Sequence, residues 1–317
     1  MKDLSLFISV ATLVILLGFI TYKGVHNPAK TDLISDVEVA SHNVIPEEAE
    51  DPFHPLPAMS LDLPVNASFA GEPIPVEIPD VYERFDRELQ INTYLHSSTL
   101  FLMKRANRWL PQIDSILERN DIPVDFKYLP LIESALINDV SPKNAVGFWQ
   151  ILKTSGKEFG LEITKEVDER YDPLKSTQAA CKYIKKAYKK FGNWTLVAAS
   201  YNRGVGGIER AAKNQKVDNY YDLFLNDETS RYVFRILAIK EIAENQGKYG
   251  FKLDPGHLYK EEKLRKVEVK ETIKNLIDFA KSQGINYKLL KRHNPWLRDE
   301  RLTVKKGKSY FISIPII

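Results

Sequence analysis

Residues 129–151 read LPLIESALINDVSPKNAVGFWQI, and the interpretation of the whole chain starts from this stretch. Its acidic residue Glu133 stands in an apolar run that includes Leu131, Ile132 and Leu136. A carboxyl group in apolar surroundings is desolvated, which disfavours its charged form. A glutamate that stays protonated near neutral pH can act as a general acid. Taken alone, the same pattern fits a partly exposed glutamate on a helix.

Three further segments follow this stretch at defined spacings. Residues 168–173 read DERYDP, residues 198–204 read AASYNRG and residues 228–233 read ETSRYV. In this order and at these spacings, the four segments resemble the catalytic domain of the soluble lytic transglycosylases (SLT). The resemblance is to the membrane-bound D type of lytic murein transglycosylase, and it covers roughly residues 83–250. It implies a lysozyme-like helical fold that acts on peptidoglycan.

The resemblance assigns roles to residues around the acidic position. Glu133 matches the family's single catalytic acid and base, and Ser134 follows it as in the family. Gln150 matches a glutamine that lines the sugar cleft, and Gly147 and Phe148 match the turn beside it. The resemblance therefore implies that Glu133 is catalytic and that the other four residues bind substrate.

Later segments complete the implied site. Tyr201 matches a tyrosine close to the catalytic carboxyl, Asn202 matches a substrate-binding asparagine, and Tyr232 lies in the late helix that closes the domain. The resemblance implies that these three residues also bind substrate. A sugar cleft needs aromatic faces for sugar rings and amides for hydroxyl and N-acetyl groups. Phe148, Trp149 and Tyr201 could supply the aromatic faces, although Trp149 fits a core position equally well.

Apolar periodicity predicts that the middle of the chain is helical. Over residues 82–119 the apolar residues recur mostly at i, i+3 and i+4, and an Asn-Asp-Ile-Pro sequence then stops the helix. Strand-like alternation is scarce before residue 250, so the predicted fold class is mainly α. Further helices are predicted over residues 126–136, 146–159, 174–191, 194–202, 205–213 and 228–246.

The number of carboxylates bears on the reaction, because a hydrolytic glycosidase usually needs two and the family pattern supplies only Glu133. The resemblance implies that Glu133 protonates the oxygen between N-acetylmuramic acid and N-acetylglucosamine. The resulting carboxylate then takes a proton from the muramyl C6 hydroxyl, which attacks C1 and gives a 1,6-anhydromuramyl end. No metal or cofactor is expected. Two alternatives stay open: a hydrolytic muramidase that uses Asp139 or another acid to position water, and a non-catalytic peptidoglycan-binding protein.

Residues 251–317 differ in character, with sixteen basic against eight acidic residues. Alternation predicts strands at residues 267–269 and 310–315, and periodicity predicts helices at residues 272–283 and 287–293. This β-α-α-β order, with an Asn-Pro pair after the second helix, resembles a lysin-motif (LysM) domain, a small α+β module that binds glycans containing N-acetylglucosamine. The family's Gly-Asp-Thr turn is missing, so a copy that packs against the catalytic domain without binding sugar is the alternative.

The first part of the chain predicts a membrane-associated leader. Residues 4–20 carry no charge and are just long enough to cross a bilayer, and Thr21-Tyr22-Lys23 is a poor signal-peptidase site. We therefore interpret residues 1–23 as a membrane anchor, with a cleaved signal segment as the alternative. Residues 24–80 are rich in proline and acidic residues and are predicted to be a linker.

These segments together predict two domains and a location. A transglycosylase domain over residues 81–250 and a LysM-like module over residues 251–317 follow the linker. We expect the protein in the cell envelope, anchored in the membrane with its catalytic domain on the periplasmic, extracytoplasmic side. Secretion after signal cleavage is the alternative.

Composition excludes several other classes. The chain has 317 residues, of which 44% are hydrophobic and 27% charged, which is typical of a globular protein. The single cysteine, Cys181, excludes an internal disulfide framework and a cysteine-based zinc site. A net charge of +3 is too small to argue for nucleic acid. The resemblance implies peptidoglycan glycan strands as a partner, and the uncharged residues 4–20 predict the membrane as the other.

Overall fold

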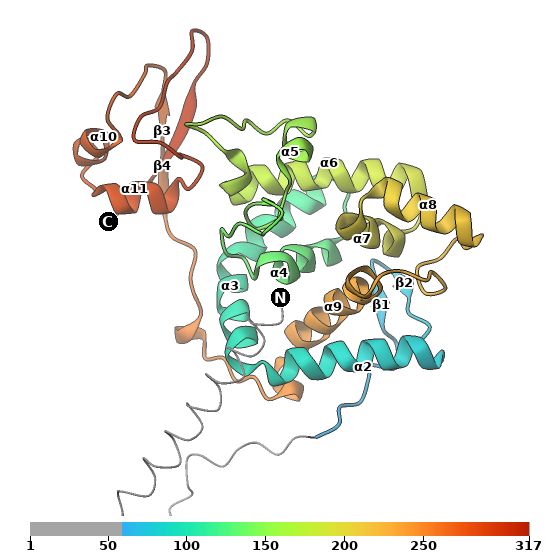
Figure 1. The fold of residues 1–317 in the computed structure, drawn as a ribbon. Coiled ribbons are helices and arrows are strands. Elements are labelled where there is room, and N and C mark those ends of the chain that lie inside the picture. Colours follow the sequence, from blue (N-terminus) through green and yellow to red (C-terminus); the bar gives the residue numbers. More distant parts are fainter. Residues whose placement is uncertain (1–58, 317) are drawn as a thin grey trace, which may run out of the picture. The chain divides into compact units, whose positions relative to one another are not determined.

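The structure, a computed structural model, describes residues 59–316. The predicted anchor or signal segment, residues 1–23, and residues 24–58 of the predicted linker lie outside the described residues. Between residues 59 and 316, no helix has both the length and the apolar character to cross a membrane. The described chain begins with a short hairpin, continues through a group of helices and ends in a small domain of two strands and two helices (Figure 1).

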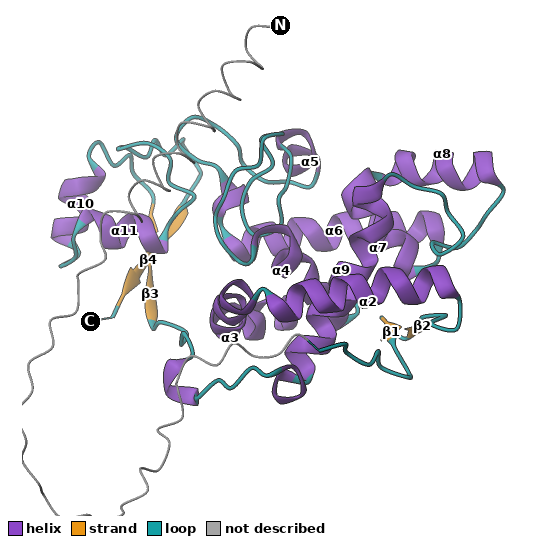
Figure 2. Ribbon diagram, turned by 60° about the horizontal axis from the view of Figure 1, so that its bottom comes forward, coloured by secondary structure: helices purple, strands orange, loops and turns teal. Residues whose placement is uncertain are grey.

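The middle of the chain is helical, as the apolar periodicity predicts, and Figure 2 shows its helices packed together. The mainly α fold class is confirmed. The helices are α2 (Pro79–Tyr94), α3 (His96–Arg119), α4 (Tyr128–Ser134), α5 (Lys153–Glu158), α6 (Pro173–Phe191), α7 (Trp194–Arg203), α8 (Val205–Gln215) and α9 (Asp227–Glu244). Short 3-10 turns cover Val124–Lys127, Glu169–Tyr171, Gln246–Tyr249 and Pro255–His257.

Helix boundaries follow local capping chemistry. α6 begins after Asp172, whose carboxylate accepts a hydrogen bond from the amide of Leu174. It ends at Gly192, whose backbone is left-handed with φ +63°. The single helix predicted over residues 82–119 is in fact two helices, because Leu95 has a non-helical backbone (φ −79°, ψ 52°) and caps both of them.

Helix α9 lies at the centre of the helical domain, where it packs against α2, α4 and α7. Its middle part, from Tyr232 to Ile242, carries most of its buried residues, whereas charged residues such as Asp227 and Glu244 near its ends are exposed. Its contact with α4 places the late segment of the sequence against the segment that contains Glu133. The buried apolar and aromatic residues of α9 are Tyr232, Val233, Phe234, Ile236, Leu237, Ala238, Ile239 and Ile242.

The predicted helix over residues 146–159 is wrong in its first half, since α5 covers only Lys153–Glu158. Residues 146–151 form a tight turn in which the amides of Val146 and Ile151 donate to each other's carbonyls at 3.1 Å. Gly147 (φ +80°) and Gln150 (φ +44°) both have left-handed backbones, which no helix accommodates. Residues 146–151 therefore form a tight turn where the first half of a helix was predicted.

The described part of the predicted linker differs from a bare spacer. Strands β1 (Ser68–Phe69) and β2 (Glu72–Pro73) pair antiparallel, and the Phe69 side chain is fully buried in the core of the helical domain. The Glu72 carboxylate accepts hydrogen bonds from the amides of Trp194 and Thr195, at 2.6 and 3.0 Å, in the first turn of α7. Proline richness concealed these anchoring residues, which bind the segment to the helices by burial and by capping.

The C-terminal domain has the predicted βααβ order. Strands β3 (Leu264–Val269) and β4 (Tyr310–Pro315) pair antiparallel, and helices α10 (Leu276–Ser282) and α11 (Tyr287–His293) lie between them in sequence. α10 begins four residues later than predicted because the Asn275 side chain caps it, accepting hydrogen bonds from the amides of Ile277 and Asp278. The described residues of both domains belong to one compact unit.

Candidate functional site

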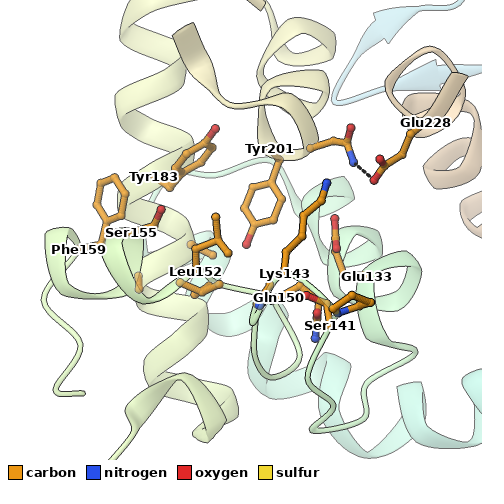
Figure 3. Close-up of a pocket in the computed structure, with 16 residues that line it drawn as sticks. Glu133, Ser141, Lys143, Gln150, Leu152, Ser155, Phe159, Tyr183, Tyr201 and Glu228 are labelled. Carbon is orange, nitrogen blue, oxygen red and sulfur yellow. Dashed lines mark hydrogen bonds between the residues drawn. The ribbon is translucent and has the colours of Figure 1, made fainter. Parts of the chain in front are cut away.

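A cavity of about 410 Å³ lies beside Glu133, bounded by residues from α4 to α7 and by the start of α9. Figure 3 shows the labelled side chains of Glu133, Lys143 and Tyr201 around this space. One side of the lining is apolar and aromatic and the other is polar, which suits an amphipathic ligand such as a sugar. The lining residues are Glu133, Ser141, Pro142, Lys143, Ala145, Gln150, Ile151, Leu152, Ser155, Phe159, Ala179, Ala180, Tyr183, Tyr201, Asn202 and Glu228.

Glu133 lies in the last turn of α4, which ends at Ala135 because that residue adopts a left-handed backbone (φ +50°). The hydroxyl of Tyr232 on α9 donates a hydrogen bond to Glu133 Oε1 at 2.5 Å. Burial raises the pKa of Glu133 above its ordinary value, and the Tyr232 hydrogen bond and the charge of Arg235 partly offset that rise. The nearby Glu228 carboxylate raises the pKa further. The position thus favours a protonated carboxyl that faces a cavity.

Tyr232 supports Glu133 from behind and does not line the cavity. Its side chain is 1% exposed. Burial and the charge of Glu133 hold the pKa of the Tyr232 hydroxyl well above its ordinary value, so this group remains a proton donor in its hydrogen bond. The structure therefore places Tyr232 where it orients the Glu133 carboxyl without itself lining the cavity.

Tyr201 on α7 lines the cavity, and its hydroxyl donates to the carbonyl of Trp149 at 2.7 Å. Its ring meets the ring of Tyr183 edge to face, with centroids 5.2 Å apart. Burial, followed by the nearby Glu133 charge, raises the pKa of Tyr201 well above its ordinary value. Tyr201 thus joins α7 to the turn that carries Gln150.

Asn202 and Gln150 are the two amide side chains of the lining, and both are held by protein groups. Asn202 Nδ2 donates to Glu228 Oε1 at 3.0 Å, and its Oδ1 accepts from the Thr229 hydroxyl at 2.8 Å. Gln150 Nε2 donates to the carbonyl of Gly147 at 2.9 Å. The amides are therefore oriented before any ligand arrives.

Four residues that were predicted to bind substrate lie outside the cavity lining, namely Tyr232, described above, and Ser134, Gly147 and Phe148. The Ser134 hydroxyl donates to the carbonyl of Phe148 at 2.9 Å and so ties α4 to the turn. Phe148 is buried against Trp109, with ring centroids 5.2 Å apart. A Cβ atom on Gly147 would lie 2.1 Å from the carbonyl oxygen of Arg170. The contacts of Ser134, Gly147 and Phe148 hold the turn in place.

The expectation that Phe148 and Trp149 supply aromatic faces is wrong, because both side chains are buried. Trp149 is fully buried and its Nε1 donates to the Thr177 hydroxyl at 2.8 Å, which makes it a core residue. Tyr183 and Phe159 supply aromatic surface to the cavity in addition to Tyr201. Sequence reasoning missed them because both lie at ordinary apolar positions of helical segments.

Charged residues of the lining were also missed. Lys143 is the one cation among the lining residues, and Glu228 is the only carboxylate there besides Glu133, within residues 59–316. The available signals were that Lys143 precedes the Gly147 turn by four residues and that Glu228 opens a segment of the family pattern. Asp139, the predicted alternative acid, is exposed and does not line the cavity. In this same described range, no group of three or more His, Cys, Asp and Glu could hold a metal ion.

Comparison with known families and proteins gives matches in both domains. Residues 116–224 match the family described as the transglycosylase SLT domain. Residues 265–316 match the soluble lytic transglycosylase C-terminal LysM-like domain. Both matches bear out the resemblances seen in the sequence.

Curated relatives match over the same part of the chain. Membrane-bound lytic murein transglycosylase D from Escherichia coli K12, and the same protein from Escherichia coli O6:H1, are each 33% identical over 195 residues. The match covers 59% of this chain and 42% of each relative, so the chain spans less than half the length of these relatives. A solved structure of lytic transglycosylase Slt from Pseudomonas aeruginosa is 17% identical, with a TM-score of 0.34 over 48% of this chain and 26% of that one.

Proposed function

We propose that this chain, which carries a transglycosylase SLT domain and a soluble lytic transglycosylase LysM-like domain, is a lytic transglycosylase that acts on peptidoglycan. The observation that carries the proposal is the position of Glu133. Its carboxyl lines the cavity, burial raises its pKa, and Tyr232 orients it from behind. A general acid needs this combination of a retained proton and a fixed direction.

In the proposed first step, Glu133 donates its proton to the glycosidic oxygen between N-acetylmuramic acid and N-acetylglucosamine. The bond from C1 to that oxygen breaks, and the leaving sugar departs with a hydroxyl group. Positive charge develops at the muramyl C1 while the Glu133 carboxylate becomes negative. The hydroxyl of Tyr232 and the charge of Arg235 both favour the charged carboxylate, so they stabilise the state that the first step produces.

In the second step, the Glu133 carboxylate takes the proton of the muramyl C6 hydroxyl as its oxygen attacks C1. The new C6–O–C1 linkage closes the 1,6-anhydro ring, and Glu133 is protonated again by the proton of the C6 hydroxyl. One carboxyl thus serves as acid and then as base, and no water enters the product. The proposal assigns Gln150, Tyr201 and Asn202 to the binding of sugar, since each lines the cavity beside Glu133.

A hydrolytic muramidase on the same fold is the second candidate, and the observation behind it is that Glu228 also lines the cavity. Two carboxylates commonly flank the bond in hydrolytic glycosidases, and Glu228 lines the same cavity as Glu133. Glu228 Oε1 already accepts the Asn202 amide, and this engagement favours a structural role for the carboxylate. Asp139, outside the lining, offers no such second group.

Product analysis separates the two reactions. Purified sacculi are digested with the full chain in water labelled at its oxygen atom, and the masses of the released fragments are measured by mass spectrometry. The transglycosylase proposal predicts ends lighter by one water than reducing ends, with no label from the solvent. Labelled reducing ends would identify a muramidase, and sacculus binding without release would identify a non-catalytic binding protein.

The proposal extends to location, because the matched relatives are named membrane-bound. We propose that residues 4–20 anchor the protein in the membrane and that the SLT domain works on its extracytoplasmic side. Cell fractionation of the full chain and of a chain without residues 1–23 tests this. Anchoring predicts that only the full chain stays with membranes after a high-salt wash, whereas cleavage predicts a shortened, soluble protein in both cases.

A further inference from the structure

A loop of the helical domain, residues 162–168, forms part of the C-terminal domain. Val167 is 2% exposed and belongs to the hydrophobic core of that domain. The Asp168 amide donates to the carbonyl of Trp296 at 2.9 Å, and the Arg298 amide donates to the carbonyl of Glu166 at 2.8 Å. These two hydrogen bonds make a short antiparallel bridge on either side of Val167, so the loop is bound by backbone and core contacts together.

Side chains of the loop add charged contacts to the same domain. The Glu166 carboxylate accepts from the Thr303 amide and from Arg301 Nε, both at 2.7 Å. The Glu162 carboxylate accepts from the hydroxyl of Tyr310 at 3.0 Å. Hydrogen bonds to a charged carboxylate are stronger than neutral ones and also restrict the orientation of the two partners. The C-terminal domain therefore holds residues 162–168 by backbone, core and side-chain contacts together.

The next residues along the chain connect this loop to the cavity. Arg170 donates from Nε and Nη2 to the two carboxylate oxygens of Asp168, at 3.0 and 2.7 Å, and both residues are buried. Arg170 Nη1 donates to the carbonyls of Asn144 and Ile151, at 3.1 and 3.2 Å. The first carbonyl lies just before the turn of residues 146–151, and the second belongs to its last residue. One guanidinium thus ties Asp168 to both ends of the turn.

Residues 141–151, the segment that Arg170 binds, supply much of the cavity wall. Without its carboxylate partner in place, the buried Arg170 would lose the group that compensates its charge, so its position depends on that of Asp168. Asp168 is bound in turn to Trp296 of the C-terminal domain through its backbone amide. The segment contributes to the lining Ser141, Pro142, Lys143, Ala145, Gln150 and Ile151.

We propose that the C-terminal LysM-like domain positions the catalytic cavity, through a path that runs from Trp296 to Asp168, from Asp168 to Arg170 and from Arg170 to the turn that ends in Gln150. The inference rests on the proposed transglycosylase function. Asp168 and Arg170 are positioning residues in this path and touch no substrate. The domain then serves the reaction itself, whether or not it also binds glycan.

Hydrogen exchange and kinetics on the full chain test this path. Val167→Ala and Glu166→Ala each loosen the loop and leave the cavity residues unchanged. The matched control is Glu262→Ala, since Glu262 also joins the two domains, through Arg108 of α3 at 3.6 Å and Arg292 of α11 at 3.2 Å, but makes no contact with the turn. The substrate is a soluble peptidoglycan tetrasaccharide, which is too short to bridge the cavity and a separate glycan-binding surface.

The path predicts faster amide exchange over residues 144–151 in Val167→Ala and Glu166→Ala, with kcat lowered roughly ten- to a hundredfold. In Glu262→Ala both quantities should match the wild type. Unchanged exchange over residues 144–151, an unchanged kcat, or an equal loss in Glu262→Ala would each overturn the inference. The exchange measurement needs no activity, so a wild type that does not cleave the tetrasaccharide would refute the proposed function separately.

Discussion

Replacing Gly147 with alanine tests whether the turn beside the cavity depends on a missing side chain. Gly147 has φ +80°, and a Cβ atom there would lie 2.1 Å from the carbonyl oxygen and 3.1 Å from the carbonyl carbon of Arg170. Backbone atoms cannot rotate away as a flexible side chain can. The new methyl group must therefore displace either the turn or the Arg170 backbone.

The expected loss has two parts. A left-handed backbone costs an L-residue about 1–2 kcal/mol, and forcing a methyl group into a packed site typically costs about 1–3 kcal/mol more. Gly192 separates the two parts, because it has φ +63° and no atom within 4 Å of its added Cβ. Gly192→Ala should lose only the backbone part, and Gly147→Ala should lose about 2–5 kcal/mol in all.

Urea denaturation of both variants gives the two free energies of unfolding, and digestion of sacculi gives their activities. Gly147→Ala should also lower activity, because Gln150 follows it in the same turn and lines the cavity. Gly192→Ala should retain activity. Equal destabilisation of the two variants would refute the close-approach argument, and full activity in a destabilised Gly147→Ala would show that the cavity does not depend on this turn.

Three further predictions concern the carboxyl, the cavity charge and the C-terminal core. The Tyr232 hydrogen bond lowers the pKa of Glu133, so Tyr232→Phe should raise that pKa and keep the acid protonated to higher pH. The basic limb of the pH–rate profile should then move to higher pH. A move to lower pH would contradict the assignment. Lys143→Gln removes the one cation of the described lining and should raise KM for sacculi more than it lowers kcat, with a weaker dependence on salt; an unchanged salt dependence would contradict this. The fully buried Asn294 donates to the carbonyl of Ser313 and accepts from its amide, both at 2.7 Å. Asn294→Ala should lower the free energy of unfolding by about 1–3 kcal/mol for each group left unsatisfied. An unchanged melting temperature would be inconsistent with these bonds.

The sequence predicted the fold where local patterns decide structure. Apolar periodicity located α6 to α9 to within two residues at their ends, because capping groups such as Asp172 and Gly192 act on their own neighbours. It failed at residues 146–151, where a bridge between Val146 and Ile151 and the carbonyls that bind Arg170 impose left-handed backbones. The Arg170 contact comes from a residue 19 positions away and leaves no local pattern, and apolar periodicity does not register the local Val146–Ile151 bridge.

The candidate site divides in the same way. Glu133 stood out by its apolar neighbours, and the resemblance supplied Gln150, Tyr201 and Asn202, which the structure brings to one cavity. Tyr232, the hydrogen-bond partner of Glu133, lies 99 residues further along the chain. Only the packing of α9 against α4 brings these two residues together. Periodicity shows that a residue is buried but not which residue it meets, and so Trp149 could be read as core or as cleft.

The most direct test of the account is the activity of Glu133→Gln. Glutamine keeps the size of the side chain and can still accept the Tyr232 hydrogen bond through its amide oxygen, but it has no acidic proton. The variant should fold with an unchanged melting temperature, bind sacculi as the wild type does and release no anhydromuramyl products. Retained release of those products by the folded variant would contradict the account, because the reaction would then proceed without the carboxyl on which it is built.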